Sequence, residues 1–204
     1  MLEAADLECE RGGRTLFRRL TFSLKGGGLL RLAGANGSGK TSLLRILCGL
    51  LTPTAGEVRW DGKQIQFLKE EYAKRLVYLG HAPAVKDDLS AAENLSIACT
   101  IAGLAPGEEA VRVALERMGV PQDRPLRRLS QGQRRRAALS RLLLSAKNPL
   151  WLLDEPFAAL DAAATRLVEE LISRHLALGA SVVFTTHQEA GIVPTQVIDL
   201  EARA

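Results

Sequence analysis

The glycine-rich segment GANGSGKT at residues 34–41 constrains the fold and chemistry of this chain more than any other part of its sequence. An apolar stretch at residues 28–33 predicts a strand before it, and apolar side chains at helical spacing predict a helix over residues 42–51 after it. Between a strand and a helix, glycines let backbone N–H groups turn toward phosphate oxygens, and the helix N-terminus adds positive potential. This context favours a phosphate loop over a chance glycine-rich turn. The residues predicted to bind the phosphates of a nucleotide here are Gly34, Ala35, Asn36, Gly37, Ser38, Gly39, Lys40, Thr41 and Ser42.

Two adjacent carboxylates follow a second predicted strand. The apolar residues 150–153 are typical of a buried strand, and Asp154 and Glu155 come directly after them. We expect Lys40 to reach the β and γ phosphates, and Thr41 and Asp154 to hold Mg²⁺. Glu155 is then placed to orient and deprotonate the attacking water. Solvated acids at a strand end are the alternative, which the phosphate loop in the same chain disfavours.

The segment LSQGQ at residues 129–133 resembles the LSGGQ signature of ABC (ATP-binding cassette) ATPases, and an arginine-rich predicted helix follows it as in that family. The motifs fall in family order, and the resemblance covers the whole chain. It implies an α/β P-loop NTPase fold with a mainly parallel central sheet, a small antiparallel β subdomain and a helical signature subdomain. It also implies a pair of cassettes, because the signature of one copy binds the γ-phosphate held by the other. The residues implied to act in trans are Ser130, Gln131, Gly132, Gln133 and Asp161.

His187 follows a predicted strand at residues 181–186 and resembles the switch histidine that contacts the γ-phosphate in ABC ATPases. Taken alone, a histidine at a strand end is usually just polar, and an aspartate that opens a helix, as Asp161 does, is usually a cap. Their positions in the motif series favour the functional interpretation. The predicted catalytic residues are therefore Glu155, His187 and Lys40. His175 has no such support, and we expect it on the surface of a helix.

The remaining pattern predicts one domain in which strands alternate with helices. Residues 1–82 and 137–204 are predicted to form the ATP-binding core with the β subdomain, and residues 83–136 the helical subdomain. A capping box from Ser90 to Glu93 predicts the start of one helix in that insert. Further strands are expected at 16–24 and 76–79, a hairpin at 52–62, and helices at 108–118, 133–144 and 161–178.

Composition excludes several classes of protein. The chain has 204 residues, 27 Lys and Arg against 23 Asp and Glu, and a formal net charge of +4. It contains no apolar run of the roughly 20 residues that a membrane helix needs, and its start lacks the pattern of a signal peptide. Its three cysteines lie far apart and predict neither zinc nor disulfides. The arginine clusters lack interleaved aromatic residues, so no nucleic-acid partner is expected.

Three positions depart from the ABC pattern. His81 stands where the family has a glutamine that contacts Mg²⁺ and water, and a neutral imidazole nitrogen could serve as that ligand. We hypothesise that its coupling weakens as pH falls through the histidine range; a plain turn residue is the alternative. Arg11 takes the place of the aromatic residue on which adenine stacks, and a guanidinium plane can stack on a base, with loose recognition that would accept GTP. Gln131 replaces the first glycine of the signature pair, and we expect activity to survive this change.

These departures, with the strings CERGGRTLF, LGHAPAVKDDLSAAENL and WLLDEPFAALD, resemble the ATP-binding subunits of cytochrome c maturation (haem exporter) systems. The resemblance implies a peripheral protein on the cytoplasmic face of a bacterial inner membrane, docked to integral-membrane subunits B and C. ATP hydrolysis would drive haem handling, and the chain would meet haem only indirectly. The alternatives are a soluble ABC ATPase, acting on nucleic acid or as an iron–sulfur assembly scaffold, and a degenerate cassette that binds ATP without cleaving it. Lys40, Asp154, Glu155 and His187 disfavour the last.

Overall fold

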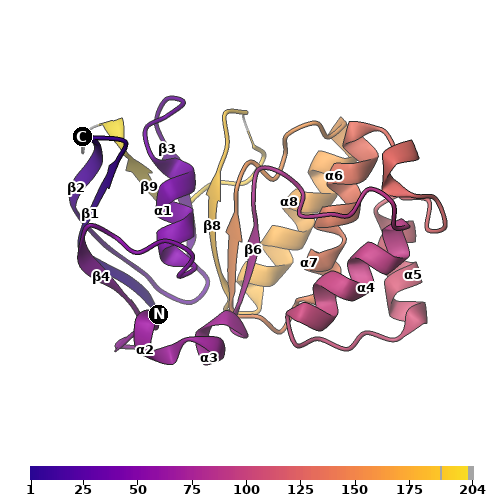
Figure 1. Ribbon diagram of the computed structural model, residues 1–204, viewed down its shortest axis with the longest axis horizontal. Coiled ribbons are helices and arrows are strands. Elements are labelled where there is room, and N and C mark those ends of the chain that lie inside the picture. Colours follow the sequence, from indigo (N-terminus) through magenta and orange to yellow (C-terminus); the bar gives the residue numbers. More distant parts are fainter. Residues whose placement is uncertain (189, 202–204) are drawn as a thin grey trace.

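The computed structural model describes residues 1–188 and 190–201, which form two sheets flanked by helices (Figure 1). One sheet has five parallel strands in the order β6-β7-β8-β3-β9, and the other has four antiparallel strands in the order β2-β1-β4-β5. The strands are β1 (Leu2–Arg11), β2 (Arg14–Leu24), β3 (Leu29–Ala33), β4 (Ala55–Trp60), β5 (Lys63–Gln64), β6 (Leu76–Leu79), β7 (Leu150–Leu153), β8 (Ser181–Thr185) and β9 (Gln196–Asp199). The helices are α1 (Lys40–Leu47), α2 (Ile65–Leu68), α3 (Glu70–Ala73), α4 (Ala91–Ile101), α5 (Glu108–Arg117), the 3-10 helix η1 (Leu126–Arg128), α6 (Gln131–Leu139), α7 (Arg141–Leu144) and α8 (Ala162–Ala177).

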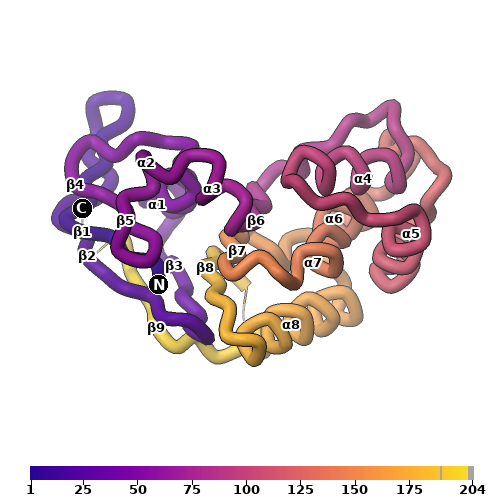
Figure 2. The backbone as a smooth tube through the Cα atoms, turned by 90° about the horizontal axis from the view of Figure 1, so that it is seen from below, coloured from indigo at the N-terminus to yellow at the C-terminus, as the bar shows by residue number. Residues whose placement is uncertain are grey.

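The central strands β7 and β8 of the parallel sheet are buried on both faces, as their continuous apolar sequences require. In β7, Leu150 and Leu152 pack into a core shared with α1 and the antiparallel sheet. Trp151 and Leu153 point to the opposite face and pack into a core shared with α4 to α8. Because successive side chains of a strand alternate between faces, this four-residue strand contributes to both cores. The two sides of the molecule are separated along its length in Figure 2, with the antiparallel sheet at one end and α4 and α5 at the other.

The strand order brings three chain segments with polar residues together. Strand β8 lies between β7 and β3, and all three run in the same direction. The glycine-rich loop follows β3, Asp154 follows β7 and His187 lies just beyond β8. Since carboxyl ends of parallel strands meet at one edge of a sheet, these segments converge there.

The predicted α/β class is confirmed, with one parallel and one antiparallel sheet. The helices expected at residues 108–118 and 161–178 are confirmed within a residue at each end, and Ser90 and Glu93 form the predicted capping box. Helix α6 begins inside the predicted helical subdomain and continues to Leu139. The subdomain boundaries themselves stay a prediction. Among the described residues, none of the helices combines the length and apolar character that crossing a bilayer demands.

Two predicted helices differ from the structure. Helix α1 begins two residues earlier than expected, at Lys40, and ends at Leu47 because Gly49 turns the chain with φ +77°. Leu50, counted in the predicted apolar face, is 69% exposed. The helix expected at residues 133–144 begins earlier and is divided at Ser140, whose side chain donates a hydrogen bond back to its own helix.

The prediction that His175 lies on the surface is wrong. Its side chain is 2% exposed and stacks on Trp151, with ring centroids 3.7 Å apart and planes 10° apart. It shares the inner face of α8 with Val168, Leu171 and Ile172, at the spacing of successive helical turns. The helix period places a polar ring in the core here.

Candidate active site

The glycine-rich loop folds around the ammonium group of Lys40. Gly39 caps α1 in a left-handed conformation, with φ +103°, which favours glycine. Lys40 is 8% exposed, and its Nζ donates to the carbonyl oxygens of Gly34 at 2.7 Å and Ala35 at 2.9 Å. The hydroxyl of Ser38 is buried and has no hydrogen-bond partner within the described part of the chain. A cationic group and an unpaired hydroxyl at a helix N-terminus fit phosphate oxygens.

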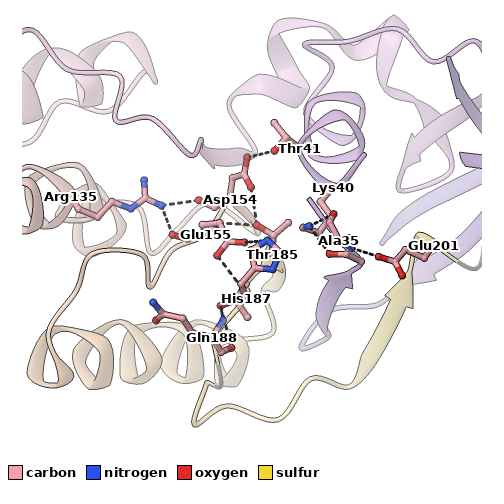
Figure 3. Close-up of polar contacts among 12 residues, drawn as sticks. Ala35, Lys40, Thr41, Arg135, Asp154, Glu155, Thr185, His187, Gln188 and Glu201 are labelled. Atoms are coloured by element: carbon pink, nitrogen blue, oxygen red, sulfur yellow. Dashed lines mark hydrogen bonds and ion pairs between the residues drawn. The ribbon is translucent and has the colours of Figure 1, made fainter. Parts of the chain in front are cut away.

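Several of the polar contacts drawn in Figure 3 involve Asp154. Its side chain is buried, Thr41 Oγ1 donates to its Oδ2 at 2.7 Å, and Thr185 Oγ1 donates to its Oδ1 at 2.8 Å. Mg²⁺ prefers hard oxygen ligands in the company of substrate phosphates. The adjacent hydroxyl of Thr41 and carboxylate of Asp154 therefore suit Mg²⁺ beside the phosphate loop.

Glu155 has a left-handed backbone, with φ +52°, which is unusual for a residue with a side chain. Such a conformation costs about 1 kcal/mol or more and persists only where neighbours enforce it. Its N–H donates to Thr185 Oγ1 at 2.8 Å. Its carboxylate accepts from the backbone N–H of His187 at 3.2 Å and lies 3.6 Å from the Nε2 of the same residue. Glu155 is thus held at both its backbone and its carboxylate, directed toward His187 (Figure 3).

These groups line one cavity of about 480 Å³, large enough for part of a nucleotide. It brings together most of the predicted loop and the predicted catalytic residues. Leu16, Ala158 and Gln188 also line it, and they belong to none of the predicted motifs. The predicted residues in its wall are Asn36, Gly37, Gly39, Lys40, Thr41, Ser42, His81, Asp154, Glu155 and His187.

The signature residues lie outside this cavity. Ser130 caps α6: its Oγ accepts from the N–H of Gln133 at 3.2 Å, and Gln133 accepts in return from the Ser130 N–H at 3.0 Å. Gln131 lines a separate cavity of about 410 Å³, which His81 also borders. A side chain at Gly132 would meet the Ala159 carbonyl oxygen at 2.9 Å, so only glycine fits there without displacement. The action of these residues in trans stays a prediction.

Asp161 and Arg11 also lie apart from the cavity. Asp161 is the N-cap of α8 and accepts from the Ala164 N–H at 2.8 Å. Arg11 is exposed at the end of β1, and Leu16 is the residue of that hairpin that reaches the cavity wall. The stacking of a base on Arg11 stays a prediction.

The capping box of Ser130 and Gln133 has the S-x-x-Q pattern, which by itself predicts the start of a helix at this position.

Two residues without a motif contact the predicted catalytic groups. Thr185 bridges the Asp154 carboxylate and the Glu155 N–H. Arg135 donates to the carbonyl oxygens of both acidic residues. A hydroxyl at the end of β8 and an arginine within a basic cluster are weak signals by themselves, because their value depends on which loops lie opposite.

Comparisons with known proteins agree with this geometry. The ABC transporter family model matches residues 17–158, so the chain belongs to the ABC transporter family. Within that family it is similar to proteins named "Cytochrome c biogenesis ATP-binding export protein CcmA". One from Aromatoleum aromaticum is 53% identical over 203 residues, covering 98% of this chain and 95% of the relative. One from Pseudomonas aeruginosa is 48% identical over 204 residues, covering 99% and 100%.

Solved structures show the same fold. An ABC transporter ATP-binding protein from Pyrococcus furiosus superposes with a TM-score of 0.85 at 25% identity, covering 100% of this chain and 98% of that one. A dimeric ATP-binding cassette in a post-hydrolysis state, bound to ADP and phosphate, superposes with a TM-score of 0.78 at 23% identity, covering 92% and 88%. The predicted family resemblance is confirmed. The names of the two relatives describe ATP-binding export proteins, and neither name describes a scaffold or a nucleic-acid-linked ATPase.

Proposed function

We propose that this chain is the ATP-hydrolysing subunit of a cytochrome c biogenesis export complex, acting as one of two cassettes. The observation that supports it most is the convergence of Lys40, Asp154, Glu155 and His187 on one cavity. They come from three segments: Lys40 begins α1, Asp154 and Glu155 follow β7, and His187 lies just beyond β8. ATP is the substrate, and the family to which the chain belongs supports ATPase activity.

The loop residues would bind and orient the triphosphate. Backbone N–H groups at the start of α1 face the phosphates, and Lys40 supplies a positive charge to the β and γ phosphates. Thr41 and Asp154 would hold Mg²⁺, with His81 at the edge of the same cavity. A bound Mg²⁺ would supply positive charge that offsets the negative charge of the phosphates.

Glu155 would act as the general base. Its carboxylate accepts the proton of the attacking water, and the N–H of His187 keeps one carboxylate oxygen oriented. The Nε2 of His187 lies 3.6 Å from that carboxylate and the residue lines the same cavity, where its ring would donate a hydrogen bond to the γ-phosphate. Positioning of water and phosphate supplies most of the catalysis in such reactions.

A second copy of the chain would complete the site. Ser130, Gln131, Gly132 and Gln133 begin α6, whose N-terminus carries positive potential suited to a γ-phosphate. They stand outside the cavity of their own chain, so they are free to serve the nucleotide of another copy. Asp161 forms an ion pair of 3.9 Å with Arg136, which lies in the same helix as these residues. Asp161 would link the two sites. Related cassettes have been solved as dimers.

The membrane partners would be the integral-membrane subunits B and C of the cytochrome c maturation system. The names of the relatives support this assignment. The chain would then work as a peripheral protein on the cytoplasmic face of the bacterial inner membrane. It would drive haem handling without binding haem itself, and no nucleic-acid partner is expected.

The base is tested by Glu155→Gln. The amide keeps the size of the side chain but cannot accept the proton, so steady-state phosphate release should fall by about a hundredfold or more while ATP binding is retained. Glu116→Gln on the exposed face of α5 is the matched control and should hydrolyse ATP at the wild-type rate. Unchanged turnover in Glu155→Gln would remove Glu155 as the base.

The partners are tested by affinity purification of the tagged chain from mildly solubilised native membranes, with an absorbance scan for haem. Recovery of multispanning subunits together with haem is the expected result. A soluble chain that brings down only scaffold proteins or nucleic acid would overturn the export role and leave the ATPase assignment intact.

A further inference from the structure

Arg135 in helix α6 is a buried cation that bonds only to backbone carbonyls in the described part of the chain. It is 5% exposed, and it takes part in no ion pair within that part. Its Nη1 donates to the carbonyl oxygens of Gly80 at 2.9 Å and His81 at 3.2 Å. Its Nη2 donates to those of Asp154 at 2.8 Å and Glu155 at 2.7 Å. Figure 3 shows the second pair of bonds.

One guanidinium therefore joins two loops of the site. The first loop follows β6 and carries His81, and the second follows β7 and carries both carboxylates. Burial lowers the pKa of Arg135, against the charges of Asp154 and Glu155, which raise it. Only the planar fork of arginine offers two pairs of donors in a fixed geometry, and a lysine ammonium could not serve both loops in the same way.

The contact with Glu155 falls on its left-handed backbone. Thr185 accepts from the N–H of this residue, and Arg135 donates to its carbonyl oxygen. The two bonds fix the peptide groups on either side of the residue, and with them the direction in which its side chain leaves the backbone. With the Arg135 bonds gone, the backbone can relax toward an ordinary conformation, which would turn the carboxylate away from His187.

We propose that Arg135 is a positioning residue for ATP hydrolysis: it holds the Glu155 and His81 loops in one arrangement and fastens them to the helix that begins with the signature. This inference rests on the proposed role of Glu155 as the base. A change at the start of α6, where the second cassette would bring its nucleotide, can therefore reach both catalytic loops through the Arg135 side chain.

Arg141 provides a control from a partly buried arginine. It lies in α7, directly after α6, and burial lowers its pKa as well. Both arginines line the cavity between β6 and α4, but in the described residues the guanidinium of Arg141 makes no hydrogen bond to either catalytic loop. A loss of activity that arises from the mere removal of a buried guanidinium would appear in Arg141→Lys too.

The experiment compares Arg135→Lys and Arg141→Lys in the full chain. We expect the kcat of Arg135→Lys to fall by about tenfold to a hundredfold, with KM for MgATP changed by less than about threefold, because positioning is lost and phosphate binding is kept. Arg141→Lys should stay within about twofold of wild type in both. An unchanged kcat in Arg135→Lys, or equal losses in both variants, overturns the proposal.

Chemical rescue separates positioning from folding. Added guanidinium, below denaturing concentrations, should restore the kcat of Arg135→Ala with saturation, and ammonium at equal ionic strength should not. Absence of rescue in an Arg135→Ala protein with wild-type circular dichroism contradicts the proposal; if that variant does not fold, the Lys comparison decides. A wild-type chain that hydrolyses no ATP would instead refute the proposed function.

Discussion

The stacked pair of His175 and Trp151 makes the stability of this protein depend on pH. Burial lowers the pKa of His175 to about 4, from an ordinary value of 6.5. Neither ring nitrogen has a well-formed hydrogen bond among the described residues, and the nearby Asn148 backbone offsets only part of the effect of burial, so a proton on the ring would be a buried and poorly compensated charge. The folded state therefore binds this proton more weakly than the unfolded chain does.

The sign and size of the effect follow from the two pKa values. Because the folded pKa is lowered, the contribution to stability is complete above about pH 6.5 and is lost progressively as pH falls to about 4. The full loss below that range is about 3 kcal/mol, and about 2 kcal/mol of it falls between pH 7.5 and pH 5. His175→Phe keeps an aromatic ring against Trp151 and removes the titrating group.

Urea unfolding followed by circular dichroism measures the effect, since the fluorescence of Trp151 would respond to the substitution itself. Between about pH 7.5 and pH 5, wild type should lose about 2 kcal/mol more free energy of unfolding than His175→Phe does. His187→Gln, at an exposed histidine, should lose as much as wild type. An equal loss in wild type and His175→Phe would refute the assignment of this pH dependence to the buried ring.

Substitutions of two further residues test the polar contacts of the site. Thr185→Val removes the hydroxyl that bridges Asp154 and Glu155 and leaves a buried N–H without an acceptor, so unfolding free energy should fall by about 1–3 kcal/mol and kcat by about tenfold or more. Thermal unfolding and phosphate release check this, and a wild-type kcat would exclude a positioning role for the hydroxyl. His81→Gln restores the amide acceptor that the family carries at this position, so the Mg²⁺ dependence of ATP hydrolysis should stay close to that of wild type, whereas His81→Ala, which removes the acceptor, should need more Mg²⁺. Equal Mg²⁺ dependence in wild type and His81→Ala would rule out His81 as a ligand.

The sequence predicted those parts of the fold whose signals are local. Strand β7 is recognisable from four successive apolar residues with Asp154 directly after them. Asp161 is recognisable as a helix cap because it directly precedes α8. Strand β1 was missed because its alternation of buried side chains is interrupted by irregular pairing around Asp6, where φ is +48°. Strand β9 is short, and it is recognisable as a strand only from its pairing with β3.

His175 was misplaced although the sequence held a usable signal. It follows Val168, Leu171 and Ile172 at helical spacing, so the period alone assigns it to the buried face. The expectation of surface exposure came from the polarity of the residue type. Its stacking partner, Trp151, lies on a separate strand, and no local sequence pattern predicts that the two rings meet.

The geometry of the catalytic carboxylate depends on contacts between distant parts of the chain. Thr41 and Asp154 are 113 positions apart, and Thr185 reaches Asp154 only because β8 pairs with β7. The left-handed backbone of Glu155 is imposed by Thr185 on one side and Arg135 on the other, and neither belongs to a recognisable motif. A chain could therefore keep every motif residue and still lose the base, if either partner changed. For this reason an acid after β7 predicts a general base, whereas the residues opposite it decide how the carboxylate is oriented.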